Sequence, residues 1–280
     1  MRTDQATPLR RWLATLGRRP AHTALAAPCP RARRVAIVSG KGGVGKTNLA
    51  GNLGIALSQM RRRVVVVGAD LGLANIEVLL GLSPCASLAD VLSGDLSLPE
   101  VLCDGPAGIR VLPGGAGIPE LARLSADEQD AVVALLQQLE ASADLILVDT
   151  AAGIGDNVLT WACAMDEVLV VTTPEPGAIT DAYAMVKVLS QAARCPRLGL
   201  VINQATHTSE AASTEAALVR VALRLLGVTI HPYGVIPQDE TVQRAVREQV
   251  PVLLAWPRSP ASVSIRRIAH LLLEREVVVR

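Results

Sequence analysis

A nine-residue stretch from Ser39 to Thr47 constrains the fold of this 280-residue chain more than any other feature. It reads SGKGGVGKT and fits the pattern GxxxxGK[ST] through Gly40, Gly45, Lys46 and Thr47. In this pattern, glycines let backbone N–H groups curl around phosphate oxygens at a helix start, the lysine reaches the β- and γ-phosphates, and the hydroxyl binds Mg²⁺. The stretch therefore predicts a P-loop. The remaining residues expected to line it are Lys41, Gly42, Gly43, Val44 and Asn48.

Lysine is rare in this arginine-rich chain. Its only lysines are Lys41, Lys46 and Lys187, so two of the three lie in one loop. Arginine can replace lysine on a solvated surface, but it is not a compact point charge inside a phosphate cradle. We therefore assign both loop lysines to the chemistry of the site, although the P-loop pattern itself does not require Lys41.

Apolar runs alternate with helical patterns along the rest of the chain. Strands are expected at 35–38, 64–68, 145–149, 167–172, 198–203 and 230–235, with a further strand, perhaps at a sheet edge, at 109–112. Helices are expected at 46–60 and near 125–141, 178–193, 211–226 and 239–248. Buried strands that each precede a helix predict an α/β fold, a doubly wound and mainly parallel sheet flanked by helices. No apolar run approaches a membrane span, which favours a soluble or peripheral protein.

Three polar residues lie at the carboxyl ends of predicted strands. Asp149 and Asn203 are the last residues of the strands at 145–149 and 198–203, and Asp70 comes two residues after the strand at 64–68. Open α/β sheets bind ligands at the carboxyl ends of their strands. These residues are therefore expected to lie near the P-loop.

Lys41 and the run DTAAGI at Asp149 resemble the deviant Walker A ATPases, the MinD/ParA group, and the resemblance extends over about residues 34–275. It implies a slow, Mg²⁺-dependent ATPase that forms an ATP-dependent homodimer, with ATP and Mg²⁺ as cofactors and Lys41 crossing to the partner's phosphates. Lys41, Lys46 and Asp70 would be catalytic, with Asp70 positioning the attacking water. Thr47 would bind Mg²⁺ directly and Asp149 through water. The adenine contacts implied by the resemblance are Asn203, Pro237 and Asp239. One departure is Gly68, where many relatives carry an acid.

The first residues after the initial methionine carry a second resemblance. The stretch DQATPLR is similar to the DQAxxLR element of the FlhG/FleN family, MinD-like ATPases that set flagellar number. That family implies regulation of flagellar number or placement, with an FlhF-type SRP GTPase as partner and flagellar transcriptional activators or C-ring proteins as further ones. The residues that would contact the GTPase are Asp4, Gln5, Ala6, Leu9 and Arg10, with Gln5 reaching its active site.

Charge separates an N-terminal arm from the body. Residues 1–34 hold eight arginines and one acid, whereas the remainder has a net charge of −6. We expect the basic arm to be flexible outside its GTPase-activating helix, and residues 35–280 to form one ATPase domain. The arm also has features of a transit peptide or a membrane-surface helix.

Rival functions share the same ATPase body. A division-site MinD would lack the DQAxxLR arm, and a ParA-like DNA partitioner needs a basic surface that an acidic body does not favour, so nucleic acid is not expected as a partner. An iron–sulfur carrier would need paired cysteines, whereas the five cysteines stand apart and are expected to be buried, reduced thiols of a bacterial cytoplasmic protein. The last core helix is expected at about 262–274, with weak or conditional contact to the inner face of the plasma membrane through 264–280.

Overall fold

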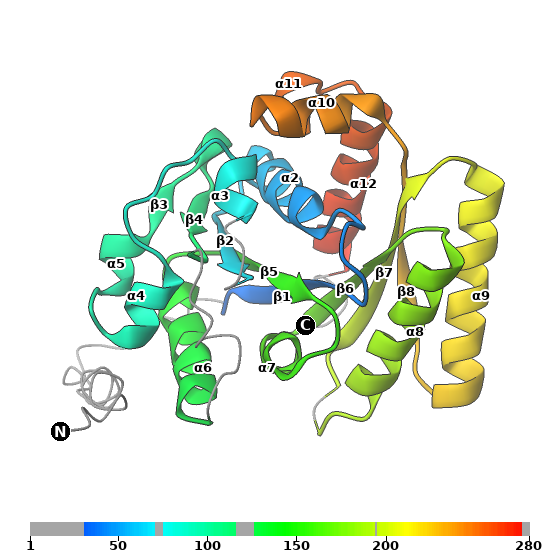
Figure 1. Ribbon diagram of the computed structural model, residues 1–280, viewed down its shortest axis with the longest axis horizontal. Helices are drawn as coiled ribbons and strands as arrows, with labels where there is room; N and C mark the ends of the chain where they lie inside the picture. Colours follow the sequence, from blue (N-terminus) through cyan, green and yellow to red (C-terminus); the bar gives the residue numbers. More distant parts are fainter. Residues whose placement is uncertain (1–30, 71–74, 116–125, 194, 276–280) are drawn as a thin grey trace.

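An eight-stranded sheet organises the chain (Figure 1). The computed structural model describes residues 31–70, 75–115, 126–193 and 195–275. The strand order is β3-β4-β2-β5-β1-β6-β7-β8, and every neighbouring pair is parallel except β3 with β4. The strands are β1 Arg33–Ser39, β2 Val64–Ala69, β3 Cys103–Asp104, β4 Arg110–Leu112, β5 Leu145–Ala152, β6 Glu167–Thr172, β7 Arg197–Ala205 and β8 Ile230–Pro237.

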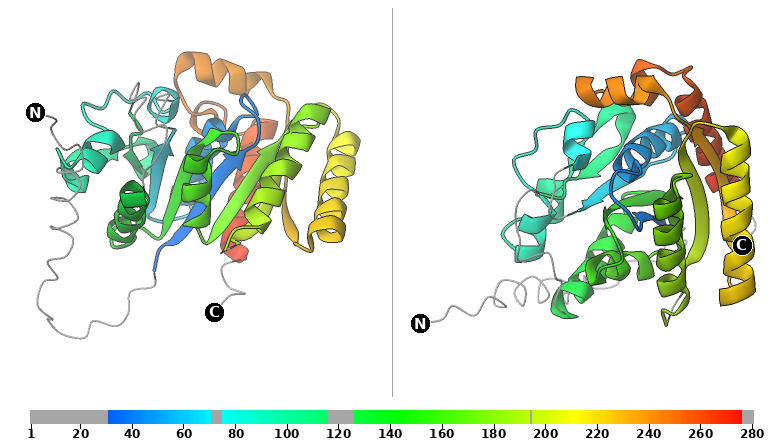
Figure 2. Two further views of the ribbon diagram at one scale, coloured as in Figure 1. Left: turned by 60° about the horizontal axis from the view of Figure 1, so that its bottom comes forward. Right: turned by 45° about the vertical axis from the view of Figure 1, so that its right-hand side comes forward.

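Helices cover both faces of this sheet (Figures 1 and 2). They are α2 Lys46–Gln59, α3 Asn75–Leu79, α4 Leu88–Ser93, α5 Leu98–Val101, α6 Ala126–Glu140, α7 Asp156–Cys163, α8 Pro176–Ser190, α9 Thr208–Leu226, α10 Glu240–Glu248, α11 Val252–Ala255 and α12 Pro260–Glu274, with a 3₁₀ turn at Pro106–Gly108. The predicted doubly wound α/β fold is confirmed.

The alternation of side chains along each strand creates two cores. In β2, Val65 and Val67 belong to the core under α4, α6, α7, α8 and α9, whereas Val64 and Val66 belong to the core under α2, α11 and α12. Neighbouring residues of a strand point to opposite faces, so a run that is apolar throughout can fill both cores. This explains why the central strands were recognisable without alternation of polar and apolar residues.

The predicted edge strand is not at the edge. β4 pairs with β2 on one side and with the two-residue strand β3 on the other, and β3 runs antiparallel at the boundary of the sheet. Five short helices were also missed: α3, α4, α5, α7 and α11. Two of them carry a recognisable start signal, because Ser87 with Asp90 and Ser97 with Glu100 form capping boxes before α4 and α5.

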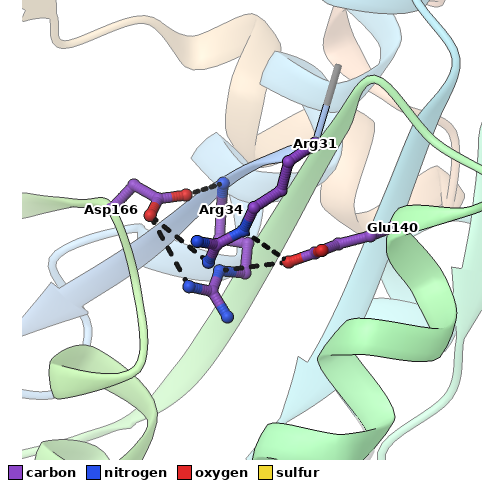
Figure 3. A network of polar contacts seen from close by, with 4 residues as sticks. All are labelled: Arg31, Arg34, Glu140 and Asp166. Carbon is purple, nitrogen blue, oxygen red and sulfur yellow. Dashed lines mark hydrogen bonds and ion pairs between the residues drawn. The ribbon is translucent and has the colours of Figure 1, made fainter. Parts of the chain in front are cut away.

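The chain enters β1 through a network of ion pairs (Figure 3). Arg31 Nε donates to Glu140 Oε1 at 2.8 Å, and the backbone N–H of Arg34 donates to Asp166 Oδ2 at 2.9 Å. Arg33, directly before Arg34, pairs with the buried carboxylate of Glu167. Three of the eight arginines of residues 1–34 thus bind acids of the body, and β1 begins two residues before the predicted boundary at 35.

The last core helix is α12, which packs against α2 and β8 as its apolar positions predict. In the described part of the chain, no helix is long and apolar enough to cross a membrane. The expectation of buried cysteines is wrong for Cys85 and Cys195, which are exposed, while Cys103 and Cys163 are half-buried. These four are free thiols, and the fifth, Cys29, lies outside the described residues.

Candidate nucleotide site

The loop between β1 and α2 presents an open helix start. Gly43 and Gly45 have φ of 79° and 91°, in the left-handed region that favours glycine. Gly45 caps α2 without a side-chain hydrogen bond, and the first turn of α2 holds no acid. Backbone N–H groups at such a start lack partners within the helix and favour an anion. The geometry therefore suits a phosphate.

Close packing explains two of the glycines. A Cβ on Gly40 would lie 2.3 Å from the carbonyl oxygen of Asp181, and a Cβ on Gly45 would lie 2.3 Å from Nδ2 of Asn203. Asn203 donates from that Nδ2 to the carbonyl oxygen of Val44 at 2.8 Å. The end of β7 therefore holds the loop directly.

Asn203 also lines a cavity of about 130 Å³ beside the loop. Asn48, Pro237 and Asp239, the other residues expected near the nucleotide, line the same cavity, and so does Gln204. The structure thus brings these predicted residues together. Asp239 also holds the backbone nearby, because its Oδ1 accepts from the N–H of Thr241 at 2.9 Å and its Oδ2 accepts from the N–H of Ala261 at 3.0 Å.

Gln204 was missed by the sequence reasoning. Its Nε2 donates to the carbonyl oxygen of Gly43 at 3.1 Å, and its φ of 55° is unusual for a residue with a side chain. No motif marks this residue, and its position directly after Asn203 was the one available signal.

Asp149 lies at the bottom of the site and is 1% exposed. Burial raises the pKa of Asp149 to about 7, although a hydrogen bond with Thr47 and the charge of Lys46 act to lower it. Its Oδ1 is buried without a hydrogen-bond partner among the described residues. Hydroxyl and carboxylate oxygens suit Mg²⁺, which usually keeps several waters. Thr47 and Asp149 therefore fit a magnesium ion held directly by the hydroxyl and through water by the carboxylate.

Asp70 follows β2 and is half-buried. In the register of β2 with β5, Gly68 is paired with Asp149 and Ala69 with Thr150, so Asp70 comes one residue past these pairs. The charge of Asp70 acts to raise the pKa of Asp149, which indicates that the two carboxylates are neighbours. The structure thus brings Asp70 to the same end of the sheet as the P-loop.

Lys41 lies at the exposed rim of the loop, unlike the buried Lys46. Its ammonium is 2.8 Å from Glu175 Oε2, and the side chains are 45% and 68% exposed, respectively. The hydrogen bond to Glu175 and its charge raise the pKa of Lys41. The lysine is therefore charged and contacts its own chain. The predicted GTPase-contacting residues, Asp4 to Arg10, lie outside the described residues.

Comparisons with known proteins define the class. Residues 31–273 match the ParA family, described as NUBPL iron-transfer P-loop NTPase. The chain is similar to the solved MinD of Pyrococcus horikoshii in complex with Mg-ADP, at 26% identity and a TM-score of 0.75 over 86% of this chain and 96% of that one. The chain belongs to the ParA family of P-loop NTPases, and it is an ATPase that uses ATP and Mg²⁺.

Two curated relatives are more similar in sequence. The chain is 43% identical to the antiactivator FleN of Pseudomonas aeruginosa, over 84% of both chains. It is 36% identical to the flagellum site-determining protein YlxH of Helicobacter pylori, over 86% of this chain and 82% of that protein. Septum site-determining MinD of Bacillus subtilis is 29% identical over 87% of this chain and 90% of its own length. The resemblance to the FlhG/FleN family is thereby confirmed.

Proposed function

We propose that this chain is an ATP-driven dimerising switch that controls flagellar number or placement. The observation that carries the proposal is the contrast between the two loop lysines. Lys46 is buried beside Asp149, where a phosphate-binding lysine belongs, whereas Lys41 lies at the exposed rim of the loop and pairs with Glu175. The similarity to FleN and YlxH supports the flagellar assignment over division-site placement, since the MinD relative is less similar.

In the proposed cycle, ATP and Mg²⁺ bind at the loop and Lys41 leaves Glu175 to reach the phosphates of a second copy. A compact ammonium can stabilise charge on the transferred phosphoryl group, because phosphoryl transfer depends mainly on positioning and electrostatics. Asp70 aligns the attacking water, and hydrolysis separates the dimer. Hydrolysis is thereby tied to dimerisation.

Variants of the two proposed catalytic groups test this cycle. Lys41→Ala should still bind ADP and ATP, but it should lose ATP hydrolysis and elute as a monomer with ATP on a sizing column. Lys187→Ala, which removes an exposed lysine on α8, is the matched control and should behave as the natural chain. Normal hydrolysis by Lys41→Ala would refute the cycle. Asp70→Ala should accumulate an ATP dimer, and a monomer with ATP would refute the role of Asp70.

We further propose that residues 4–10 act on an FlhF-type SRP GTPase through Gln5. The test is GTP hydrolysis by that GTPase with and without this full-length protein. The natural chain should stimulate hydrolysis, Gln5→Ala should not, and Gln191→Ala on the body should stimulate fully. Equal stimulation by Gln5→Ala would exclude Gln5 as the activating residue.

Location is part of the same proposal. We place the protein in the bacterial cytoplasm, with conditional contact between residues 264–280 and the inner face of the plasma membrane. Sedimentation with vesicles of anionic lipid, in ATP and in ADP, tests this contact. Absence of the protein from the pellet under both conditions would remove the membrane from the proposal.

A further inference from the structure

A buried glutamate beside the magnesium residues has no role in the site described so far. Glu77 lies on α3 and is 3% exposed. Its Oε1 accepts a hydrogen bond from the backbone N–H of Gly114 at 2.6 Å. Its Oε2 is buried and has no hydrogen-bond partner among the described residues, as is also true of Asp149 Oδ1. These are the two carboxylate oxygens left in this condition in the described part of the chain.

A short series of contacts places the two groups at the same end of the sheet. Gly68 is paired with Asp149 across β2 and β5. A Cβ on Gly68 would lie 2.8 Å from the backbone nitrogen of Gly114, the same nitrogen that donates to Glu77. The charge of Glu77 also acts to raise the pKa of Asp149. The backbone of Gly114, which Glu77 holds, therefore occupies the space next to Gly68, and a side chain at position 68 could not enter it without moving that backbone.

Burying two carboxylate oxygens without hydrogen-bond partners raises the free energy of the folded protein. A buried polar atom without a partner loses its hydration, and a buried charge requires a compensating charge. A hydrated Mg²⁺ supplies both, because its waters donate hydrogen bonds and the ion carries two positive charges. No group of three or more acidic, His or Cys side chains in the described part of the chain is placed to hold a metal directly. Contact through water fits this arrangement.

We propose that Glu77 is a positioning residue for the magnesium ion of the ATP site, and that its Oε2, like Asp149 Oδ1, accepts a hydrogen bond from a metal-bound water. The same carboxylate then connects the ion to the Gly114 loop through Oε1. The competing explanation is that Glu77 only holds this loop. Glu77→Gln separates the two, because glutamine keeps an oxygen that can accept from Gly114 but removes the negative charge.

The measurement is the Mg²⁺ concentration that gives half of the thermal stabilisation by saturating ADP. For Glu77→Gln this concentration should rise about tenfold, as expected for the loss of a hydrogen bond to a charged group. ADP affinity measured in EDTA should be unchanged. Asp144→Asn is the matched control, since Asp144 also accepts from a backbone N–H, that of Arg63, but lies before β5 at the other end of the sheet. Its Mg²⁺ requirement should not change.

An unchanged Mg²⁺ requirement in a folded Glu77→Gln protein would overturn the proposal and leave Glu77 as a loop anchor. If that variant does not fold, Glu77→Asp takes its place. Its shorter side chain keeps the charge but should not reach both Gly114 and the water shell, so the Mg²⁺ requirement should again rise. No rise would likewise overturn the proposal. The measurement uses ADP and requires neither dimerisation nor a GTPase, so it is independent of the flagellar assignment.

Discussion

The side-chain amide of Asn203 donates to the carbonyl oxygen of Val44 at 2.8 Å, and so joins the end of β7 to the P-loop. The loop is therefore held from outside as well as by its own glycines. Gln204 adds a second bond to Gly43. The last residues of β7 thus hold the phosphate-binding backbone that follows β1.

Asn203→Asp should weaken ADP binding more than Asn203→Ala does. Alanine removes one hydrogen bond, which contributes about 0.5–1.5 kcal/mol, whereas aspartate also places an acceptor against the carbonyl oxygen of Val44. Fluorescence titration with a labelled ADP would rank the three proteins. Equal affinity in all three would show that the loop does not depend on this bond.

Gly45→Ala should unfold more easily and lose ADP binding. The new Cβ would lie 2.3 Å from Nδ2 of Asn203, and the φ of 91° is strained for alanine. Gly177→Ala is the matched control, because a Cβ there, in the first turn of α8, meets nothing within 4 Å. It should be neutral or stabilising by up to about 1 kcal/mol. Thermal melts with and without ADP give both results, and a stable, ADP-binding Gly45→Ala would contradict the packing argument.

Asp239→Ala should lower the free energy of unfolding by about 1–2 kcal/mol, because the carboxylate caps α10. Burial acts to raise the pKa of Asp239, but bonds from Thr241, Ala261 and Ser259 outweigh it and the pKa is lowered. The folded state therefore favours the ionised form. Its contribution is present above the ordinary value of 3.8 and is lost as pH falls through the lower folded-state pKa.

Urea unfolding as a function of pH checks this prediction. The difference between the natural chain and Asp239→Ala should shrink only in strong acid. A difference that stays constant down to complete acid unfolding would contradict the role of the charge. ADP titration of the same variant measures its ADP affinity and so tests separately whether Asp239 contacts the nucleotide.

Two glutamates that pair with basic residues should differ greatly in their effect on stability. Glu167 is 1% exposed and binds both Arg33 and the hydroxyl of Tyr233. Glu167→Gln leaves the guanidinium of Arg33, whose side chain is only 12% exposed, without its counter-charge, and should lower the free energy of unfolding by about 3–5 kcal/mol. Glu175→Gln breaks the pair with Lys41, in which both side chains are exposed, and should change the free energy of unfolding very little. Urea unfolding of both variants at one pH compares their free energies of unfolding. Similar losses in Glu167→Gln and Glu175→Gln would refute the distinction between the buried and the exposed pair.

The central sheet and the P-loop could be predicted because their signals are local. Val64–Ala69 is apolar throughout and followed by Asp70, and the glycines and Lys46 occur at fixed spacing. Both features follow from chemistry that acts within a few residues. The doubly wound fold then follows from the alternation of such strands with helices.

Other features depend on contacts between distant segments. Glu77 belongs to a five-residue helix without a strong pattern, and its buried carboxylate accepts a hydrogen bond from Gly114, which is 37 residues away in the sequence. The edge position of β3 depends on a two-residue strand that carries almost no signal. The left-handed backbone of Gln204 lies where the pairing of β7 with β8 becomes irregular and where its side chain reaches Gly43. Such features become visible only when the segments are placed together.

The contrast between the lysines makes the chain suitable for selective chemical labelling. Amine-reactive reagents find only three lysine side chains. Lys46 is buried, whereas Lys187 is exposed on α8 and far in sequence from the loop, so it can serve as an internal reference for the reactivity of Lys41. Mass spectrometry of a briefly acylated sample would then report how accessible a single ammonium at the rim is under each nucleotide condition, without introducing any mutation.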